Sequence, residues 1–113
     1  MHIDLRKAVE VSLEEDKAED ICVINLAGKS TIAEYMVIAT GRSKRHLKSI
    51  ADRLAERLKV AGISPIGVEG KGEADWILLD LGDVIVQLFR QEVREFYELE
   101  KMWAAILPEM ANS

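Results

Sequence analysis

The sequence predicts an α/β protein, more closely described as α+β, in which helices flank a mixed five-stranded sheet. Three observations carry this prediction. Helical and strand-like patterns follow one another through the 113 residues, with no linker or internal repeat between them. A strand–helix–strand crossover between residues 35 and 68 requires at least one parallel pair of strands. Short turns elsewhere require antiparallel pairs, so we expect one domain over residues 1–113.

The first elements are a helix and two strands. Apolar residues recur at helical spacing from Leu5 to Leu13, and Asp4 is placed to be the N-cap. Residues 21–26 are almost entirely apolar and predict a buried strand. Residues 35–39 are apolar throughout, which is typical of a strand in the centre of a sheet.

The clearest helix begins after Ser43, which is a good N-cap residue. Its apolar stripe runs unbroken from Leu47 to Ala61, and Gly62 occupies the position that a C′ glycine takes. Residues 66–68 then form a short predicted strand.

The most informative stretch is 75–103, which holds both tryptophans and both phenylalanines. Its apolar runs 76–79 and 84–89 flank a glycine-containing turn, a pattern that predicts a β-hairpin. A helix from about 91 to about 107 is expected next. The apolar stripe of this helix is wider than one sheet contact needs, so either all of it is core or part of it is a docking surface.

Composition limits the function classes. The chain is 49% hydrophobic and 31% charged, and its net charge of −5 argues against general nucleic-acid binding. No apolar run approaches the roughly 18 residues that span a membrane, and the first residues lack the apolar stretch of a signal peptide. We therefore expect a cytoplasmic protein. Cys22 is the only cysteine, which excludes an intramolecular disulfide and a thiolate metal cluster.

Basic residues crowd the start of the second helix. Arg42, Lys44 and Arg45 surround the N-cap Ser43. A helix N-terminus offers free N–H groups and positive potential, so this cluster is a candidate contact for phosphate or an RNA backbone. The other interpretation is a solvated basic face balanced by acids elsewhere in the fold. The residues alone leave both open.

A nucleotidyltransferase is the enzymatic alternative, since a Gly-x-Ser segment follows a strand. That chemistry needs two closely spaced carboxylates that hold two Mg²⁺ ions. Residues 66–69 offer a single acid, and Asp80 and Asp83 are separated by a turn, where Asp usually caps N–H groups. Neither histidine lies beside an evident nucleophile. We predict no catalytic residue, metal or cofactor, with a Mg-dependent nucleotidyltransferase-like enzyme as the alternative.

Acidic residues mark the ends of the predicted hairpin strands. We call Glu69, Asp75, Asp80 and Asp83 the acidic rim, and Trp76 opens a strand beside it. The rim is either a means of keeping strand ends soluble or an electrostatic docking patch with an aromatic anchor. Composition does not decide between these interpretations.

The motif W-x-L-x-D-x-G-D, followed by R-x-F-Y-x-L-E-x-x-W, resembles the signature of the ribosomal silencing factor family, the Iojap-related proteins. Residues 28–51 and 65–70 fit the same family, and the similarity extends over roughly residues 5–103. The resemblance implies a fold similar to nucleotidyltransferases without their catalytic carboxylates. It also implies a translational repressor that binds the large ribosomal subunit through its ribosomal protein number fourteen. Small-subunit joining would be blocked when nutrients are short, and the free protein would be a homodimer.

The resemblance also implies a partner-binding surface, which maps onto these residues: Glu69, Gly70, Trp76, Asp80, Gly82, Asp83, Arg94, Tyr97 and Glu100. Adjacent ribosomal RNA would be met by Arg42, Ser43, Lys44 and Arg45. Two positions depart from the family pattern. Gln87 stands where a histidine is common, so hydrogen bonding is kept but titration is lost. Met36 stands at an often aromatic position, a change of core volume that methionine tolerates.

Overall fold

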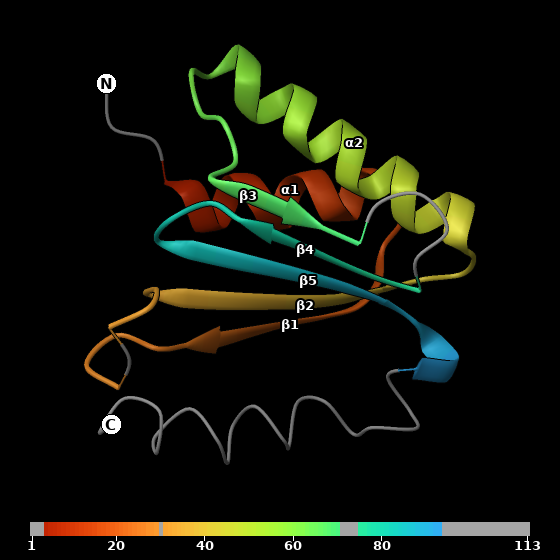
Figure 1. The fold of residues 1–113 in the computed structure, drawn as a ribbon, viewed down its shortest axis with the longest axis horizontal. Helices are drawn as coiled ribbons and strands as arrows, with labels where there is room; N and C mark the ends of the chain where they lie inside the picture. Colours follow the sequence, from red (N-terminus) through yellow and green to blue (C-terminus); the bar gives the residue numbers. More distant parts are fainter. Residues whose placement is uncertain (1–3, 30, 71–74, 94–113) are drawn as a thin grey trace.

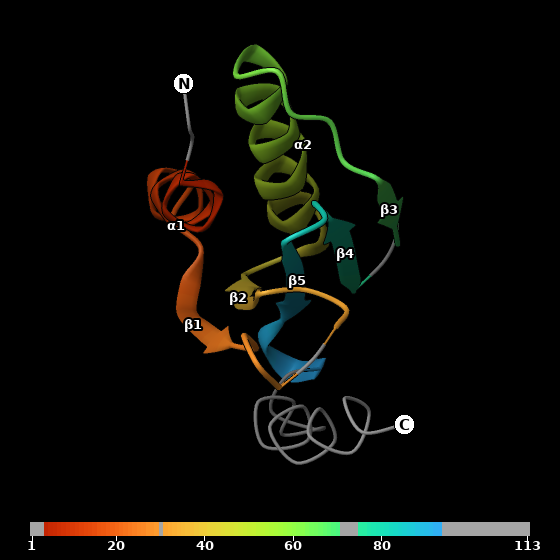
Figure 2. The same cartoon turned by 90° about the vertical axis from the view of Figure 1, so that its left-hand side faces the viewer.

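The computed structural model describes residues 4–29, 31–70 and 75–93. Within them, two helices cover one face of a five-stranded sheet (Figure 1). The elements in chain order are α1 (Leu5–Glu15), β1 (Glu19–Asn25), β2 (Tyr35–Gly41), α2 (Lys44–Val60), β3 (Gly67–Glu69), β4 (Trp76–Asp80) and β5 (Val84–Arg90). Figure 2 shows α1 and α2 on the same side of the strands. The predicted α+β class with a mixed five-stranded sheet is confirmed.

The strand order is β1-β2-β5-β4-β3. β2 and β5 are parallel, and the other neighbours are antiparallel. The predicted parallel pair is therefore present, but its members are β2 and β5. The crossover through α2 carries the chain past both strands of the hairpin, so that β3 lies at the edge.

Both helices begin and end where their sequences predict. The Asp4 carboxylate accepts the Lys7 N–H (3.2 Å), and the Ser43 hydroxyl accepts the His46 N–H (3.0 Å). Each cap satisfies a donor that the first helical turn leaves free. α2 ends in a Schellman motif, in which Gly62 has φ +83° and donates to the Lys59 carbonyl at 2.9 Å.

The prediction that β1 is buried is wrong. β1 is an edge strand that pairs only with β2, and its residues are half-buried or exposed. Its pairing is also interrupted by a register shift between Glu19 and Cys22. An apolar run does not reveal whether one or two neighbours will cover a strand, because that depends on the order of the strands in the sheet. The predicted central position of β2 is confirmed.

The core divides between the two faces of the sheet. The larger part joins both helices to the sheet and includes Leu13, Leu54 and Leu88, each fully buried. A smaller cluster on the other face includes Ile38 and Phe89. Burying one such side chain contributes about 1.5–3 kcal/mol, so the helical side supplies most of the stability.

The predicted final helix begins at residues 91–93, which are helical. The remainder of the predicted span lies outside the described residues, and so does the question of which of its apolar lines is core. Among the described helices, none is long and apolar enough to cross a membrane.

Candidate partner-binding site

The β4–β5 hairpin sends alternate side chains to opposite faces of the sheet. Ile77 and Leu79 are buried on the side of α2. Trp76, Leu78 and Asp80 alternate with them and therefore belong to the other face. Two predicted site residues, the tryptophan and the first aspartate of the turn, thus share the face that lies away from the helices.

Trp76 is half-exposed yet held on two sides. Its relative exposure is 46%, high for so large an apolar side chain. The indole ring is stacked on Phe89, its register partner in β5, with ring centroids 5.8 Å apart and planes inclined by 6°. The indole Nε1–H donates to the Gln87 Oε1 at 3.0 Å. One side of the ring is therefore presented to solvent in a fixed orientation.

Gln87 is a fully buried polar side chain, with 0% exposure. Its oxygen accepts from Trp76, and its Nε2 donates to the Met36 sulfur at 3.3 Å. Positions 36 and 87, the two that we expected to depart from the family pattern, are therefore in direct contact. The sequence did not predict that contact.

Gly70 contributes through its backbone. It has φ +83°, and a Cβ added there would lie 2.1 Å from the Trp76 carbonyl oxygen. Only glycine allows this approach. Together with Glu69, Trp76 and Leu78, it lines a hollow of about 190 Å³. Three predicted site residues thus surround one concave surface.

The turn between β4 and β5 is built on Asp80. Its Oδ1 accepts the N–H of Gly82 at 2.9 Å, and Gly82 has φ +90°. This is the turn-capping role that the spacing predicts. The backbone carbonyl of Asp83 accepts hydrogen bonds from the N–H groups of Glu34 (2.8 Å) and Tyr35 (3.0 Å), and Asp83 itself is exposed. The Asp80 carboxylate therefore holds the turn, whereas the Asp83 carboxylate does not bond to Gly82.

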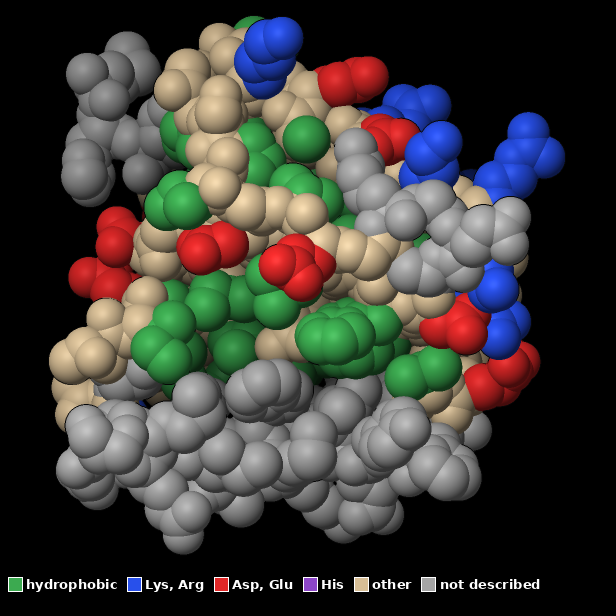
Figure 3. All heavy atoms as spheres, in the orientation of Figure 1, with side chains coloured by type: hydrophobic (Ala, Val, Ile, Leu, Met, Phe, Trp, Pro, Cys, Tyr) green, Lys and Arg blue, Asp and Glu red, His purple; other side chains and the backbone are tan. Residues whose placement is uncertain are grey.

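The acidic rim occupies both ends of β4. Glu69 lies beside Trp76, and Asp75 precedes it. Asp80 and Asp83 are at the opposite end, which is about 13 Å away for four residues of extended strand. Asp75 is moreover paired with Arg90 (2.6 Å). The rim is therefore two separate groups. Figure 3 shows acidic side chains above and to the right of the apolar surface in this view.

The basic start of α2 is partly balanced by acids. Arg42 lies 3.9 Å from Glu19, and Lys44 lies 3.9 Å from Asp75. Both pairs are exposed, and such pairs contribute about 0–1 kcal/mol. Figure 3 shows basic side chains gathered on the side of the view where α2 begins. These pairs favour the interpretation as a solvated basic face whose charge is balanced by acids. Arg45 is also exposed at this end of α2.

His46 has a structural part in this region. Its Nδ1 accepts the backbone N–H of Arg42 at 3.0 Å, so its Nε2 carries the proton and donates to the Asp16 carbonyl at 2.8 Å. The imidazole ties the end of α1 to the start of α2. Within the described parts of the chain, no group of three or more His, Cys, Asp or Glu side chains is placed to hold a metal ion.

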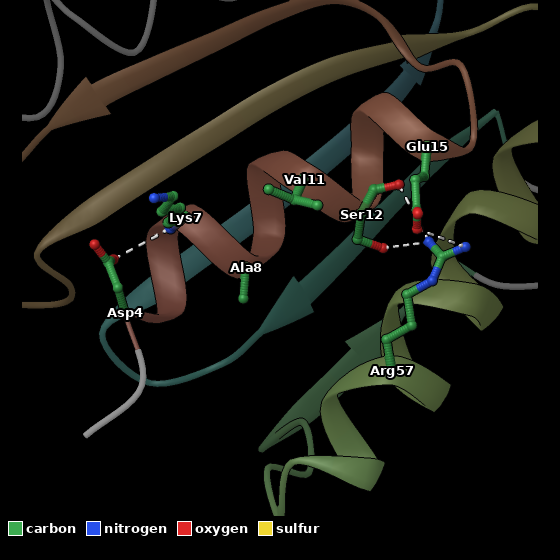
Figure 4. Close-up of a pocket in the computed structure, with 7 residues that line it drawn as sticks. All are labelled: Asp4, Lys7, Ala8, Val11, Ser12, Glu15 and Arg57. Carbon is green, nitrogen blue, oxygen red and sulfur yellow. Dashed lines mark hydrogen bonds and ion pairs between the residues drawn. The ribbon is translucent and has the colours of Figure 1, made fainter. Parts of the chain in front are cut away.

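A second hollow, of about 400 Å³, lies between α1 and α2 (Figure 4). It is lined by Asp4, Lys7, Ala8, Val11, Ser12, Glu15 and Arg57. Arg57 donates to the Ser12 hydroxyl (2.8 Å) and pairs with Asp16 (2.6 Å) and Glu15 (3.3 Å). The hydrogen bond to Asp16 raises the pKa of Arg57 above its usual value. This guanidinium joins the two helices.

Three of the expected partner-binding residues, Arg94, Tyr97 and Glu100, lie outside the described residues. The others form two groups, one around Trp76 and one at the Asp80–Asp83 turn. The fold and the site together define a small α+β domain in which β4 carries the half-exposed Trp76 and has acidic side chains at both of its ends.

A family model described as "Ribosomal silencing factor during starvation" matches residues 2–112. The protein named ribosomal silencing factor RsfS in Zymomonas mobilis is 54% identical over 99 residues, which cover 88% of this chain and 74% of that protein. Its namesake in Bacillus subtilis is 36% identical over 97 residues, covering 86% and 82%. A crystal structure from Chromobacterium violaceum matches with a TM-score of 0.85 at 33% identity, covering 92% of this chain and 88% of that one.

The chain belongs to the ribosomal silencing factor family. Its role is that of a ribosomal silencing factor, a regulator of translation.

Proposed function

We propose that this protein binds the large ribosomal subunit through ribosomal protein number fourteen and thereby blocks joining of the small subunit. Family membership supports a ribosomal partner. The observation that carries the contact is Trp76, a large aromatic side chain that is 46% exposed and yet fixed by a ring stack and a hydrogen bond. Exposed aromatic side chains with a polar surround are typical centres of protein interfaces.

The acidic groups complement a basic partner. Glu69 is exposed beside the Trp76 hollow, and Asp83 is exposed at the turn. Lysine and arginine side chains of the ribosomal protein would meet these two positions, which favours association and the correct orientation. Asp80, Gly70 and Gly82 act differently, because they shape the backbone that carries the contact residues. Arg94, Tyr97 and Glu100 complete the proposed surface.

The mechanism is steric. A protein seated on a surface that the small subunit needs prevents joining without any chemical step, so the proposed function requires no catalytic residue, metal or cofactor. Asp80, which a Mg²⁺-dependent enzyme would need as a ligand, already accepts the Gly82 N–H. We further propose that the protein acts in the cytoplasm and that the free protein is a homodimer.

Ribosomal RNA beside the protein contact is a proposed second partner for Arg42, Ser43, Lys44 and Arg45. The weak, exposed pairs of Arg42 and Lys44 can be exchanged for phosphate at small cost. Reversing the charge of Lys44 and Arg45 together would then reduce the dependence of binding on salt concentration by up to about two units of log–log slope. An unchanged slope would contradict the RNA contact.

Co-sedimentation with separated ribosomal subunits tests the main proposal. We expect the protein to pellet with large subunits, to leave small subunits unbound, and to reduce formation of joined ribosomes when it is added first. Failure to pellet with large subunits would contradict the proposal. Calorimetric titration with nucleotide and Mg²⁺ tests the enzymatic alternative, and tight binding there would revive it.

A further inference from the structure

Two hydrogen bonds in series end at Trp76. The amide of Gln87 accepts from the indole N–H at 3.0 Å and donates to the Met36 sulfur at 3.3 Å. An indole nitrogen can only donate, and a thioether sulfur can only accept. Both neighbours therefore demand the same orientation of the amide. A flipped amide would place its NH₂ against the indole N–H and its oxygen against the sulfur.

The surroundings make this arrangement rigid. Gln87 is 0% exposed and Met36 is 3% exposed, so the amide and the sulfur are both shielded from water. Polar groups that lose their partner in such a site are strongly disfavoured. Phe89, 4% exposed, supports the indole ring by stacking. Of these four side chains, only Trp76 reaches solvent. The buried contacts therefore fix the orientation of an exposed ring.

We infer that Gln87 is a positioning residue that holds Trp76 in its docking orientation before the partner arrives, and that Met36 orients Gln87. The inference rests on the proposed function, in which Trp76 meets the ribosomal protein. A side chain that is ordered in advance loses less entropy on binding. Positions 36 and 87 therefore act together on a surface that neither of them reaches.

The variant Gln87→Met removes both hydrogen bonds while keeping an unbranched side chain of similar size. The matched control is Ile38→Val, since Ile38 is the register neighbour of Gln87 in β2 and is also buried. This control weakens the same cluster without touching a hydrogen bond. If Gln87 had a purely structural role, the two variants would differ from each other in stability but not in the indole signal of Trp76 or in affinity for large subunits.

The free protein gives the first readout. In ¹⁵N–¹H spectra the indole N–H signal of Trp76 is the one lost in Trp76→Phe. We expect its solvent exchange to become at least about tenfold faster in Gln87→Met, the factor that corresponds to one lost hydrogen bond of ordinary strength. Ile38→Val should leave this signal unchanged. An unchanged exchange rate in Gln87→Met would overturn the inference.

Binding to large subunits gives the second readout. Gln87→Met should bind about two- to tenfold more weakly, the cost of ordering one side chain during association. Ile38→Val should bind as the wild type does. Equal binding by folded Gln87→Met and wild type would overturn the inference. If the wild type itself does not bind, the proposed function fails, and the indole signal still decides whether Gln87 holds Trp76.

Gln87→His adds a pH-dependent test and a substitute if Gln87→Met does not fold. A neutral imidazole can accept the indole N–H, whereas the protonated ring has no acceptor. Burial lowers the pKa of an imidazole below its usual value of about 6.5, so this variant should bind as the wild type does above about pH 7.5 and lose affinity only at a pH below that usual value. Binding clearly weaker than that of the wild type above about pH 7.5, where the imidazole is neutral and can accept, would contradict the positioning role.

Discussion

Polar groups have different roles on the two sides of the sheet: on one side they join two helices, and on the other they orient an exposed side chain. Between α1 and α2, Arg57 contacts acceptors of Ser12, Glu15 and Asp16. Figure 4 shows the contacts with Ser12 and Glu15. On the other side, neutral groups hold Trp76 in place and leave one side of its ring in solvent. The first arrangement uses its charge to join elements. The second orders the half-exposed Trp76 side chain, and this difference is the reason why we propose this side for docking.

The largest expected effect is that of Gly70→Ala, which acts on the docking side through the backbone. A Cβ at this position meets the Trp76 carbonyl at 2.1 Å and requires a left-handed backbone conformation. We expect a loss of about 3 kcal/mol in the free energy of unfolding, measured by urea denaturation. The matched control is Gly28→Ala, where φ is +76° and no atom lies within 4 Å. Equal losses in the two variants would show that the contact with Trp76 is unimportant.

Trp76→Ala should separate binding from stability. Removing an anchor of this kind costs about 2 kcal/mol of binding free energy, or about thirtyfold in affinity for large subunits. Affinity can be measured by co-sedimentation over a range of subunit concentrations. Val60→Ala is the control, because Val60 is 91% exposed at the end of α2, on the helical side. A folded Trp76→Ala protein that bound normally would remove Trp76 from the site.

Arg57→Ala tests the opposite side. It removes charged hydrogen bonds to Ser12 and Asp16, and we expect about 1.5 kcal/mol lower stability from thermal or urea unfolding. Affinity for large subunits should stay as in the wild type, because Arg57 lies on the face opposite Trp76 and near the end of α2 that is far from the proposed RNA contact. Weaker binding at full occupancy of the folded state would contradict the assignment of the docking side.

The smallest effects distinguish the two aspartates of the turn. Asp80→Ala loses the hydrogen bond to the Gly82 N–H and should lower stability by about 1 kcal/mol, whereas Asp80→Asn keeps an acceptor and should restore most of it. Asp83→Ala should leave stability within about 0.5 kcal/mol of the wild type and weaken subunit binding at low salt. Identical behaviour of the two alanine variants would argue against separate roles.

Much of the fold follows from local sequence. Asp4, Ser43 and Gly62 each satisfy or relieve groups within one helical turn of their own position, so their roles can be predicted without tertiary information. The exposed position of β1 could not be predicted, because the order of strands depends on which segments pack together. For the same reason, the sequence did not predict that β5 would be the parallel neighbour of β2.

The residues of the candidate site around Trp76 were proposed from the family motif. The turn role of Asp80 was predicted from its spacing to Gly82 and is confirmed by the hydrogen bond to the Gly82 N–H. The separation of the Trp76 group from the Asp80–Asp83 turn by the length of β4 was not predicted. The sequence shows that these acids flank strands, but it does not show which of them share an end of the sheet. The bond from Trp76 to Gln87 depends on hairpin register, since it joins side chains that are diagonal neighbours across two strands.

We propose that the Trp76 surface docks on the large subunit and thereby excludes the small one. The most direct test is a subunit-joining assay with wild-type protein, Trp76→Ala and Val60→Ala, each added to large subunits before small subunits. We expect wild type and Val60→Ala to suppress joining equally, and Trp76→Ala to require about thirtyfold more protein for the same suppression. Equal suppression by all three folded proteins would contradict it.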